Sequence, residues 1–330
     1  MSEVKIIRNS QLVEKLIVVN GFPGCGKTML SPIVSSFDKV EIMQYSETIE
    51  QISELYFLKK ISEDTAQSMI KIHVDRLLYK AYMGRDINCR PSDLSSIFRN
   101  KPFKYIYRML SKGDELIPQK IKNNKPTLNL TTHMLYPNIQ LFSEVFGKKM
   151  IFIEVVRNPL YMIIQKEKNF KMYKENRSGH INYEYDSKEY IFFAKGWEKK
   201  FDELNTFEKA IYSIKWYFDY IYKYQKEDVL IIPFEKFVIN PNNFIDAIAE
   251  KLESHVNKDV KKMMKLQKVP RKYINDGPSL DIYKRCGWEP PKYYDEDLEF
   301  EARRKLIKEK ISIESLSVLD EMIRKYRFTF

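Results

Sequence analysis

The stretch at 16–31, LIVVNGFPGCGKTMLS, constrains this chain more than any other part of its sequence. Its first four residues are apolar and predict a short buried strand. They are followed by GFPGCGKT at 21–28, which matches the phosphate-loop pattern G-x-x-x-x-G-K-[ST]. Because the chain has only 10 glycines, the match is specific. A glycine-rich strand-to-helix turn without a ligand is the alternative interpretation.

We expect the predicted loop to bind an anion through its backbone N–H groups and through two side chains. Backbone N–H groups at a helix N-terminus can bind phosphate or sulfate oxygens, and glycines let the backbone come close. Lys27 would bring a positive charge to the terminal oxygens, and Thr28 a hydroxyl for an oxygen or for magnesium. We expect Cys25 to fill a tight turn. The candidate anion-binding residues are Phe22, Pro23, Gly24, Cys25, Gly26, Lys27 and Thr28.

Composition narrows the class of protein. A hydrophobic content of 44% supports a large core, and a formal charge of +11 favours anionic ligands or a basic solvated surface. Cys25, Cys89 and Cys286 have no metal-site spacing and predict a reducing compartment. The N-terminus has no apolar signal core, and no window approaches 18 apolar residues. We therefore expect a cytoplasmic protein with no membrane span, no metal and no nucleic-acid partner; the oligomeric state stays open.

Five apolar runs predict an α/β fold, a P-loop three-layer fold with a central, mostly parallel five-stranded sheet. We treat 1–330 as one domain. Residues 49–123 form a helical insertion with little strand signal, and 292–330 form C-terminal helices. The predicted strands are 16–19, 39–43, 127–131, 149–156 and 228–233.

Apolar periodicity also predicts the helices. Pro32 must fall in the first turn of the first helix to be tolerated. We expect a polar loop at 120–126, a loop and helix over the site at 160–200, and a basic loop at 265–291. The predicted helices are 29–37, 47–61, 63–83, 91–111, 137–146, 206–225, 241–255, 297–310 and 315–328.

Candidate site residues follow three of the predicted strands. His133 comes just after the third strand and Arg157 just after the fourth, and Glu47 lies beyond the second. Because ligands of open α/β sheets bind at the carboxyl ends of the strands, we expect these side chains near the phosphate loop. The late basic loop, with Arg271 and Lys272, could close over them.

The order of these motifs resembles the sulfotransferases that use 3'-phosphoadenosine 5'-phosphosulfate (PAPS). The motifs are the phosphate loop, T-H-x-L-x-P at 132–137, an apolar strand ending R-N-P at 157–159, and an apolar strand ending F-E at 234–235. The resemblance covers about residues 15–290 in order. It implies PAPS, or its product PAP, as the bound nucleotide and an unidentified hydroxyl or amine acceptor such as a saccharide or small metabolite.

The resemblance also implies residue roles. The loop, including Lys27, would bind the 5'-phosphosulfate, and His133 would be the general base; in another branch of the family Glu47 would be the base. Arg157 would grip the 3'-phosphate. Arg271 and Lys272 are similar to a late R-K-G loop that contacts this phosphate, with Tyr273 in place of its glycine.

Two residues depart from the family pattern. Gln165 stands where the family has a serine that contacts the 3'-phosphate, and Lys27 stands where it usually has a hydroxyl residue. The complete kinase-type loop supports an alternative, a magnesium-dependent P-loop kinase or NTPase that uses ATP or GTP, with Thr28 as metal ligand. That class usually has an Asp at the end of an apolar strand, and none of the five strands ends that way. A second alternative is a non-catalytic nucleotide-binding protein.

Overall fold

The computed structural model describes residues 4–174, 179–224, 228–285 and 289–330. Cys286 lies outside the described residues. At the centre is a five-stranded sheet in the order β2-β3-β1-β4-β7, and every neighbouring pair is parallel. The predicted α/β fold with a parallel five-stranded sheet is therefore confirmed. The strands are β1 Lys15–Gly21, β2 Gln44–Tyr45, β3 Thr127–Thr131, β4 Met150–Val156 and β7 Val229–Pro233, and β5 Asn182–Tyr185 pairs with β6 Lys188–Ile191 in a separate hairpin.

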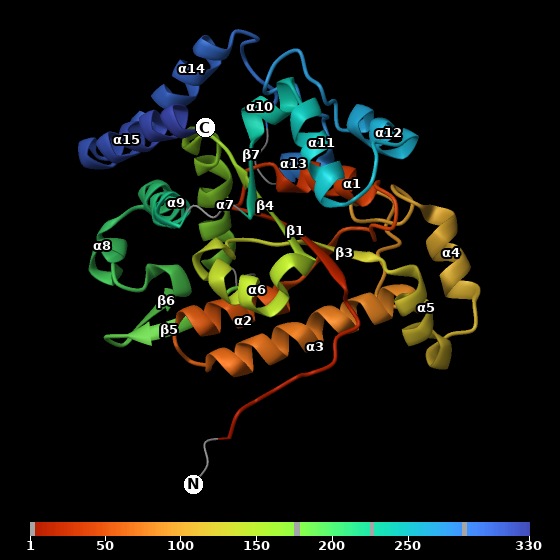
Figure 1. The fold of residues 1–330 in the computed structure, drawn as a ribbon. Helices are drawn as coiled ribbons and strands as arrows, with labels where there is room; N and C mark the ends of the chain where they lie inside the picture. Colours follow the sequence, from red (N-terminus) through yellow and green to blue (C-terminus); the bar gives the residue numbers. More distant parts are fainter. Residues whose placement is uncertain (1–3, 175–178, 225–227, 286–288) are drawn as a thin grey trace.

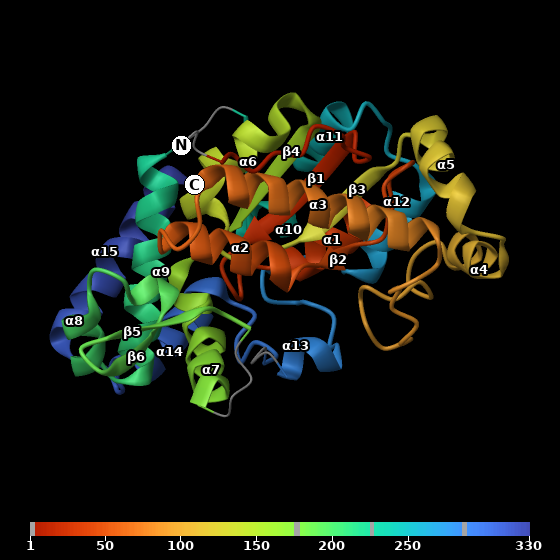
Figure 2. The ribbon, with the colours of Figure 1, turned by 90° about the horizontal axis from the view of Figure 1, so that it is seen from below.

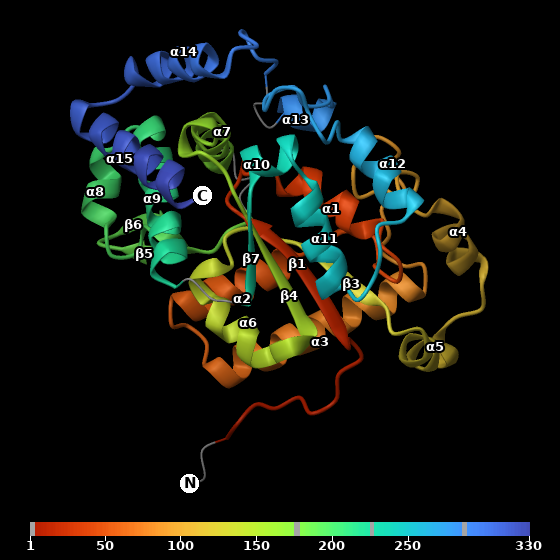
Figure 3. The same cartoon turned by 45° about the horizontal axis from the view of Figure 1, so that its top comes forward.

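Helices cover both faces of the sheet and give three layers. Figures 1 and 3 show α1, α11 and α12 on one side of the strands and α2, α3 and α6 on the other. Figure 2 shows α2 and α3 crossing in front of the sheet. The helices are α1 Lys27–Ser35, α2 Glu47–Phe57, α3 Glu63–Tyr82, α4 Pro102–Leu110, α5 Ile117–Asn124, α6 Ile139–Phe146, α7 Ile163–Lys174, α8 Glu198–Glu203, α9 Thr206–Lys223, α10 Phe234–Ile239, α11 Asn242–Lys251, α12 Lys258–Leu266, α13 Asp281–Arg285, α14 Glu296–Lys308 and α15 Ile313–Thr329. Within the described part of the chain, we find no helix with the length and hydrophobicity needed to cross a membrane.

The second strand is the main difference from the predicted sheet. The prediction of a strand at 39–43 is wrong, because only Val40 makes an isolated bridge there and the strand itself is Gln44–Tyr45. In between, the chain turns its polar groups toward the insertion. The Glu41 carboxylate accepts hydrogen bonds from α4, and the Ile42 N–H donates to the Tyr105 hydroxyl at 2.8 Å. These tertiary contacts replace the strand pairing that the alternating pattern predicted.

Several helix boundaries also differ. The helix predicted at 91–111 is confined to Pro102–Leu110, where proline starts the helix after a left-handed residue. The polar segment at 120–126 is not wholly a loop, because α5 extends through Asn124. Pro32 is not in the first turn: α1 begins at Lys27, so proline lies inside it. The carbonyl of Thr28 therefore has no intrahelical N–H donor at that position.

A buried polar network joins the strands beneath the site. The Asn20 side-chain amide donates to Glu154 at 2.6 Å, and the Tyr217 hydroxyl lies 2.7 Å from the other oxygen of the same carboxyl group. The Thr132 hydroxyl donates to Oδ1 of the Asn20 side chain at 3.0 Å. Burial raises the pKa of Glu154 to about 8, against the opposing effect of these hydrogen bonds and of Lys27. The network fixes the ends of β1, β3 and β4 relative to one another.

Candidate active site

A pocket of about 220 Å³ opens at the carboxyl ends of the strands, where the phosphate loop begins. β1 lies between β3 and β4 in the sheet. The residues that follow β3 and β4 therefore flank the loop on opposite sides. The pocket is lined by Gly24, Gly26, Lys27, Thr28, Met29, Tyr45, His133, Arg157, Gln165, Phe234, Arg271, Asn275, Gly277 and Tyr283.

Two glycines of the loop have positive φ angles, a backbone conformation that glycine adopts without strain. Gly26 precedes α1 with a φ of 102°, and Gly24 has a φ of 92°. A Cβ on Gly26 would lie 2.3 Å from Cδ2 of Phe234. Lys27 is the first residue of α1, and its ammonium donates to the Gly21 carbonyl at 3.2 Å. The loop is thus folded tightly around a lysine at a helix N-terminus, a setting suited to anions.

His133 is held by a carboxylate from α2. Glu50 Oε1 accepts the backbone N–H of His133 at 2.8 Å and lies 3.0 Å from its Nδ1. Burial, and then the charge of Lys27, lower the pKa of His133, while Glu50 opposes them. The imidazole is therefore neutral near pH 7. With Nδ1–H donating to Glu50, Nε2 carries the lone pair and can accept a proton.

On the other side of the loop stands Arg157. One of its terminal nitrogens donates to the Gly24 carbonyl at 3.1 Å and the other to Asn275 Oδ1 at 3.3 Å. The guanidinium carbon lies 4.3 Å from the centre of the Phe234 ring. Burial lowers the pKa of Arg157. Its Nε is buried and has no hydrogen-bond partner among the described residues, while the side chain of Asn275 also forms a hydrogen bond with Tyr161.

A second arginine reaches the same side of the pocket. The Arg271 guanidinium carbon lies 5.4 Å from the centre of the Phe234 ring, and its Nη1 donates to the Ile274 carbonyl at 2.9 Å. Burial, together with the charge of Arg157, lowers the pKa of Arg271 to about 10, so the group stays positive at neutral pH. Phe234 thus contacts two guanidinium groups, and their positive charges face one end of the pocket.

Most of the sequence-predicted residues come together in this pocket, but Phe22, Pro23 and Cys25 do not. All three are buried and absent from its lining. The Cys25 sulfur occupies the space where a Cβ on Gly21 would lie, at 2.5 Å. Burial raises the pKa of the Cys25 thiol. The positive charge of Lys27 is the largest effect in the opposite direction. Cys25 therefore fills the turn, as we expected. The predicted residues that line the pocket are Gly24, Gly26, Lys27, Thr28, His133, Arg157, Gln165 and Arg271.

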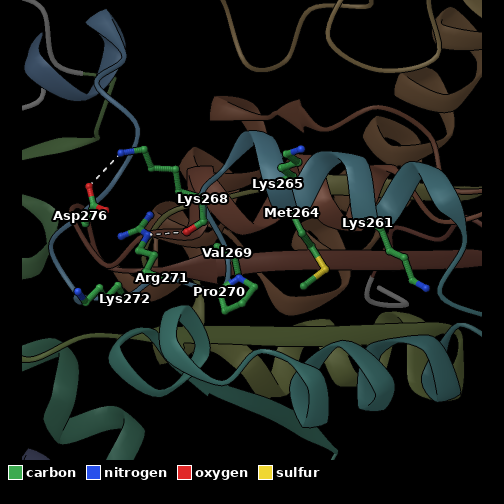
Figure 4. Close-up of a pocket in the computed structure, with 9 residues that line it drawn as sticks. All are labelled: Lys261, Met264, Lys265, Lys268, Val269, Pro270, Arg271, Lys272 and Asp276. Carbon is green, nitrogen blue, oxygen red and sulfur yellow. Dashed lines mark hydrogen bonds and ion pairs between the residues drawn. The ribbon is translucent and has the colours of Figure 1, made fainter.

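Glu47 and Lys272 lie elsewhere. Glu47 is the exposed first residue of α2 and does not line the pocket, whereas Glu50, one turn later, contacts His133. Lys272 lines a neighbouring groove of about 490 Å³, which shares Arg271 with the pocket at the strand ends (Figure 4). Figure 4 shows this groove beside α12, with Lys268 paired to Asp276 at 2.9 Å.

Sequence reasoning missed several residues of the site. Glu50 shows only a helical spacing from Glu47, and nothing in the sequence connects it with His133. Phe234 was noted only as the end of a strand motif. Asn275 lies in the basic loop without a motif of its own, and Tyr283 lies on α13. Their positions depend on contacts between distant segments.

The residues that line the pocket are poor in metal ligands. None of the described lining residues is Asp or Glu. Across the described ranges, no group of three or more His, Cys, Asp or Glu side chains is placed to hold a metal ion. The pocket therefore presents hydrogen-bond donors and positive charges to a ligand, together with the neutral imidazole of His133.

Comparison with solved structures finds sulfotransferases at 11% sequence identity. One from Mycobacterium avium aligns over 97% of this chain and 78% of its own, with a TM-score of 0.44. The sulfotransferase domain of the Synechococcus PCC 7002 olefin synthase aligns over 99% and 100%, with a TM-score of 0.45. A mouse sulfotransferase complexed with PAP aligns over 95% and 84%, with a TM-score of 0.37. No protein-family model and no curated protein matches the chain. At such TM-scores these similarities do not themselves assign a function.

Proposed function

We propose that the protein is a sulfotransferase that moves a sulfuryl group from PAPS to a hydroxyl or amine acceptor. The observation that carries this proposal is that a histidine lies on one side of the phosphate loop and two arginines lie on the other. His133, held by Glu50, flanks the loop beyond β3, and Arg157 with Arg271 flanks it beyond β4. This arrangement suits a donor with one anionic group at the reacting end and a second at the other.

The residues present fit such a donor. The N-terminus of α1 and Lys27 would hold the 5'-phosphosulfate. Arg157 lines the pocket, and a 3'-phosphate would supply acceptors for its guanidinium group. Arg271 adds a positive charge on that side. Bound PAPS would supply an electrophilic sulfuryl group.

The chain's own groups can then assist transfer. His133 Nε2 accepts the proton of the acceptor hydroxyl or amine as its oxygen or nitrogen bonds to sulfur. Glu50 keeps the proton of the neutral imidazole on Nδ1. Lys27 stabilises the negative charge that develops on the departing phosphate oxygen, a preorganised electrostatic effect. The proton ends on His133 and the electron pair of the broken S–O bond on that oxygen.

The loop itself keeps a phosphoryl-transfer alternative open. Lys27 and Thr28 match the residues that bind terminal phosphates and magnesium in kinases and NTPases. Magnesium in such sites is bound through one or two carboxylates besides the phosphates. The described lining residues supply none, which favours the sulfotransferase proposal. Loss of transfer with retained nucleotide binding would instead indicate the non-catalytic alternative.

Calorimetry separates these possibilities on one preparation. Adenosine 3',5'-bisphosphate should bind without metal, and more tightly than ATP with or without magnesium. Binding of ATP alone, and only with magnesium, would overturn the proposal in favour of a kinase or NTPase. Transfer of radioactive sulfate from labelled PAPS to a panel of hydroxyl and amine acceptors then tests catalysis, with His133→Ala as the inactive control.

A further inference from the structure

Helix α4 carries a row of exposed apolar side chains. Phe103, Tyr107 and Leu110 are 85%, 74% and 83% exposed, and their spacing places them on one face. We call these three residues the α4 ridge. Other exposed apolar residues adjoin it in the sequence, and a contiguous exposed apolar patch usually marks an interaction site. They are Phe98, Ile106, Met109 and Leu116.

The opposite face of α4 is firmly attached to the body of the protein. Glu41 has a fully buried side chain and pairs with Lys104 at 2.8 Å and with Arg108 at 2.6 Å. Tyr105 is fully buried and donates to the same carboxylate at 2.6 Å. These buried contacts of Glu41 fix one face of α4 against the protein, so the α4 ridge on the other face points toward solvent.

A basic cavity lies beside the ridge. Its volume is about 390 Å³, and Tyr107 belongs both to the ridge and to the cavity wall. The wall contains Lys104, Arg108, Lys112 and Lys120, while none of its described residues is Asp or Glu. Glu41 neutralises part of the positive charge of Lys104 and Arg108. Lys112 and Lys120 add further positive charge to the cavity wall. Over residues 99–125 the sequence has 8 Lys or Arg and 2 Asp or Glu.

We propose that this edge of the molecule docks on an anionic membrane surface. The α4 ridge would enter the interface between headgroups and acyl chains, and Lys112 and Lys120 would contact headgroup phosphates and carboxylates. Exposed Phe, Tyr and Leu next to Lys and Arg are the combination that interfacial helices use. Docking of this kind requires no membrane-spanning helix.

The shape and the charge favour a lipid surface over a protein partner. Figures 1 and 3 show α4 at the outer edge of the molecule. An outward ridge with a positive rim can enter a fluid, negatively charged layer without a complementary groove. A second copy of this chain would bring the same positive rim and repel it. None of the ridge or cavity residues lines the nucleotide pocket, so the proposal is independent of the enzymatic one.

Vesicle sedimentation tests the proposal on the full chain. The wild type should bind vesicles of phosphatidylcholine mixed with phosphatidylserine, and bind pure phosphatidylcholine at least about tenfold more weakly. Leu110→Glu should reduce binding to the mixed vesicles about tenfold or more by placing a charge in the interface. The double change Lys112→Glu and Lys120→Glu should do the same. Because these positions lie on the surface, thermal unfolding should show that both variants remain folded.

Matched controls come from α15 and α14, which lie away from α4 in Figure 1. Ile313→Glu alters an apolar residue that is 88% exposed, and the double change Lys305→Glu and Lys308→Glu alters two exposed lysines. Both variants should bind the mixed vesicles like the wild type. The proposal fails if the wild type does not bind anionic vesicles or binds both vesicle types equally. It also fails if Leu110→Glu and the Lys112→Glu, Lys120→Glu double variant bind like the controls. It also fails if the wild type is a dimer that Leu110→Glu dissociates.

Discussion

One carboxylate oxygen of Glu50 serves both the backbone and the ring of His133. Oε1 accepts the backbone N–H at 2.8 Å and lies 3.0 Å from Nδ1. Burial of Glu50 raises its pKa, but the charge and hydrogen bonds of His133, together with the charge of His180, outweigh burial, and the net pKa is lowered. Glu50 is thus ionised at neutral pH and fixes both the position and the tautomer of the imidazole. The same contact leaves Nε2 as the basic nitrogen.

Replacing Glu50 should change the pH dependence of catalysis. His133 acts when neutral, so activity is present above its lowered pKa and falls as pH drops through it. Because Glu50 raises the pKa of His133, Glu50→Gln should move the acid limb of kcat to lower pH. Loss of the tautomer constraint should also reduce kcat about tenfold to a hundredfold. A pH series of kcat measures both effects.

Glu54 provides a matched control for this prediction. It lies one turn after Glu50 on α2 and pairs with Nδ1 of His180 rather than His133. Glu54→Gln should leave the acid limb in place. Since the chain has only 4 histidines, NMR titration can follow His133 directly, without substrate. An unchanged His133 titration in Glu50→Gln would contradict the assigned contact.

Arg157→Ala should discriminate between nucleotides. We expect binding of adenosine 3',5'-bisphosphate to weaken about a hundredfold, because charge-assisted hydrogen bonds to a phosphate are lost. ATP lacks the 3'-phosphate, and its binding should weaken only a few-fold through the lost support of Gly24. Arg304→Ala is a control, since Arg304 pairs with Asp320 outside the pocket. Equal losses for the two nucleotides in calorimetry would be inconsistent with a 3'-phosphate role for Arg157.

Gly26→Ala should damage the loop more than a glycine change elsewhere. Both Gly26 and Gly196 have a positive φ, of 102° and 91°, but only at Gly26 would a Cβ collide with the Phe234 ring. Gly196→Ala should therefore cost about 1 kcal/mol in unfolding free energy from backbone strain alone. Gly26→Ala should cost more and abolish nucleotide binding. Urea unfolding and calorimetry measure the two effects, and similar behaviour of the two variants would count against the contact with Phe234.

Glu41 should make the stability of the protein sensitive to acid. Burial raises its pKa, but Lys104 and Arg108 outweigh burial and hold it at about 2, against an ordinary value of 4.5. Because the folded pKa is the lower one, this stabilisation is complete well above pH 4.5 and is lost as pH falls toward 2. The difference corresponds to about 3 kcal/mol.

Urea unfolding of Glu41→Gln between pH 7 and acid conditions tests this linkage. At pH 7 the variant should lose about 3 kcal/mol, because two cations are left without their buried partner. Its deficit relative to the wild type should shrink as pH decreases. Asp320→Asn, which removes a partly exposed ion pair with Arg304, should cost less than about 1 kcal/mol. A Glu41→Gln deficit that does not depend on pH would refute the assigned shift.

The sequence predicted the sheet best where strands are long and buried. The runs at 16–19, 127–131, 149–156 and 228–233 overlap β1, β3, β4 and β7, because a continuous apolar segment between polar boundaries favours a strand inside a parallel sheet. Short elements were predicted poorly. β2 has two residues, and the hairpin of β5 and β6 was not predicted. Such elements are fixed by their partners rather than by their own pattern.

The sequence by itself determined the phosphate loop and the strand ends that meet beside it. A parallel sheet brings the carboxyl ends of its strands to one edge, so His133 and Arg157 could be placed from the motifs that follow β3 and β4. Only the tertiary structure decided which carboxylate holds the histidine. Packing of Ile49 and Ile52 sets the rotation of α2 about its axis, and this rotation turns Glu50 toward His133 and leaves Glu47 exposed. Such a rotation depends on the whole core and cannot be read from the helix alone.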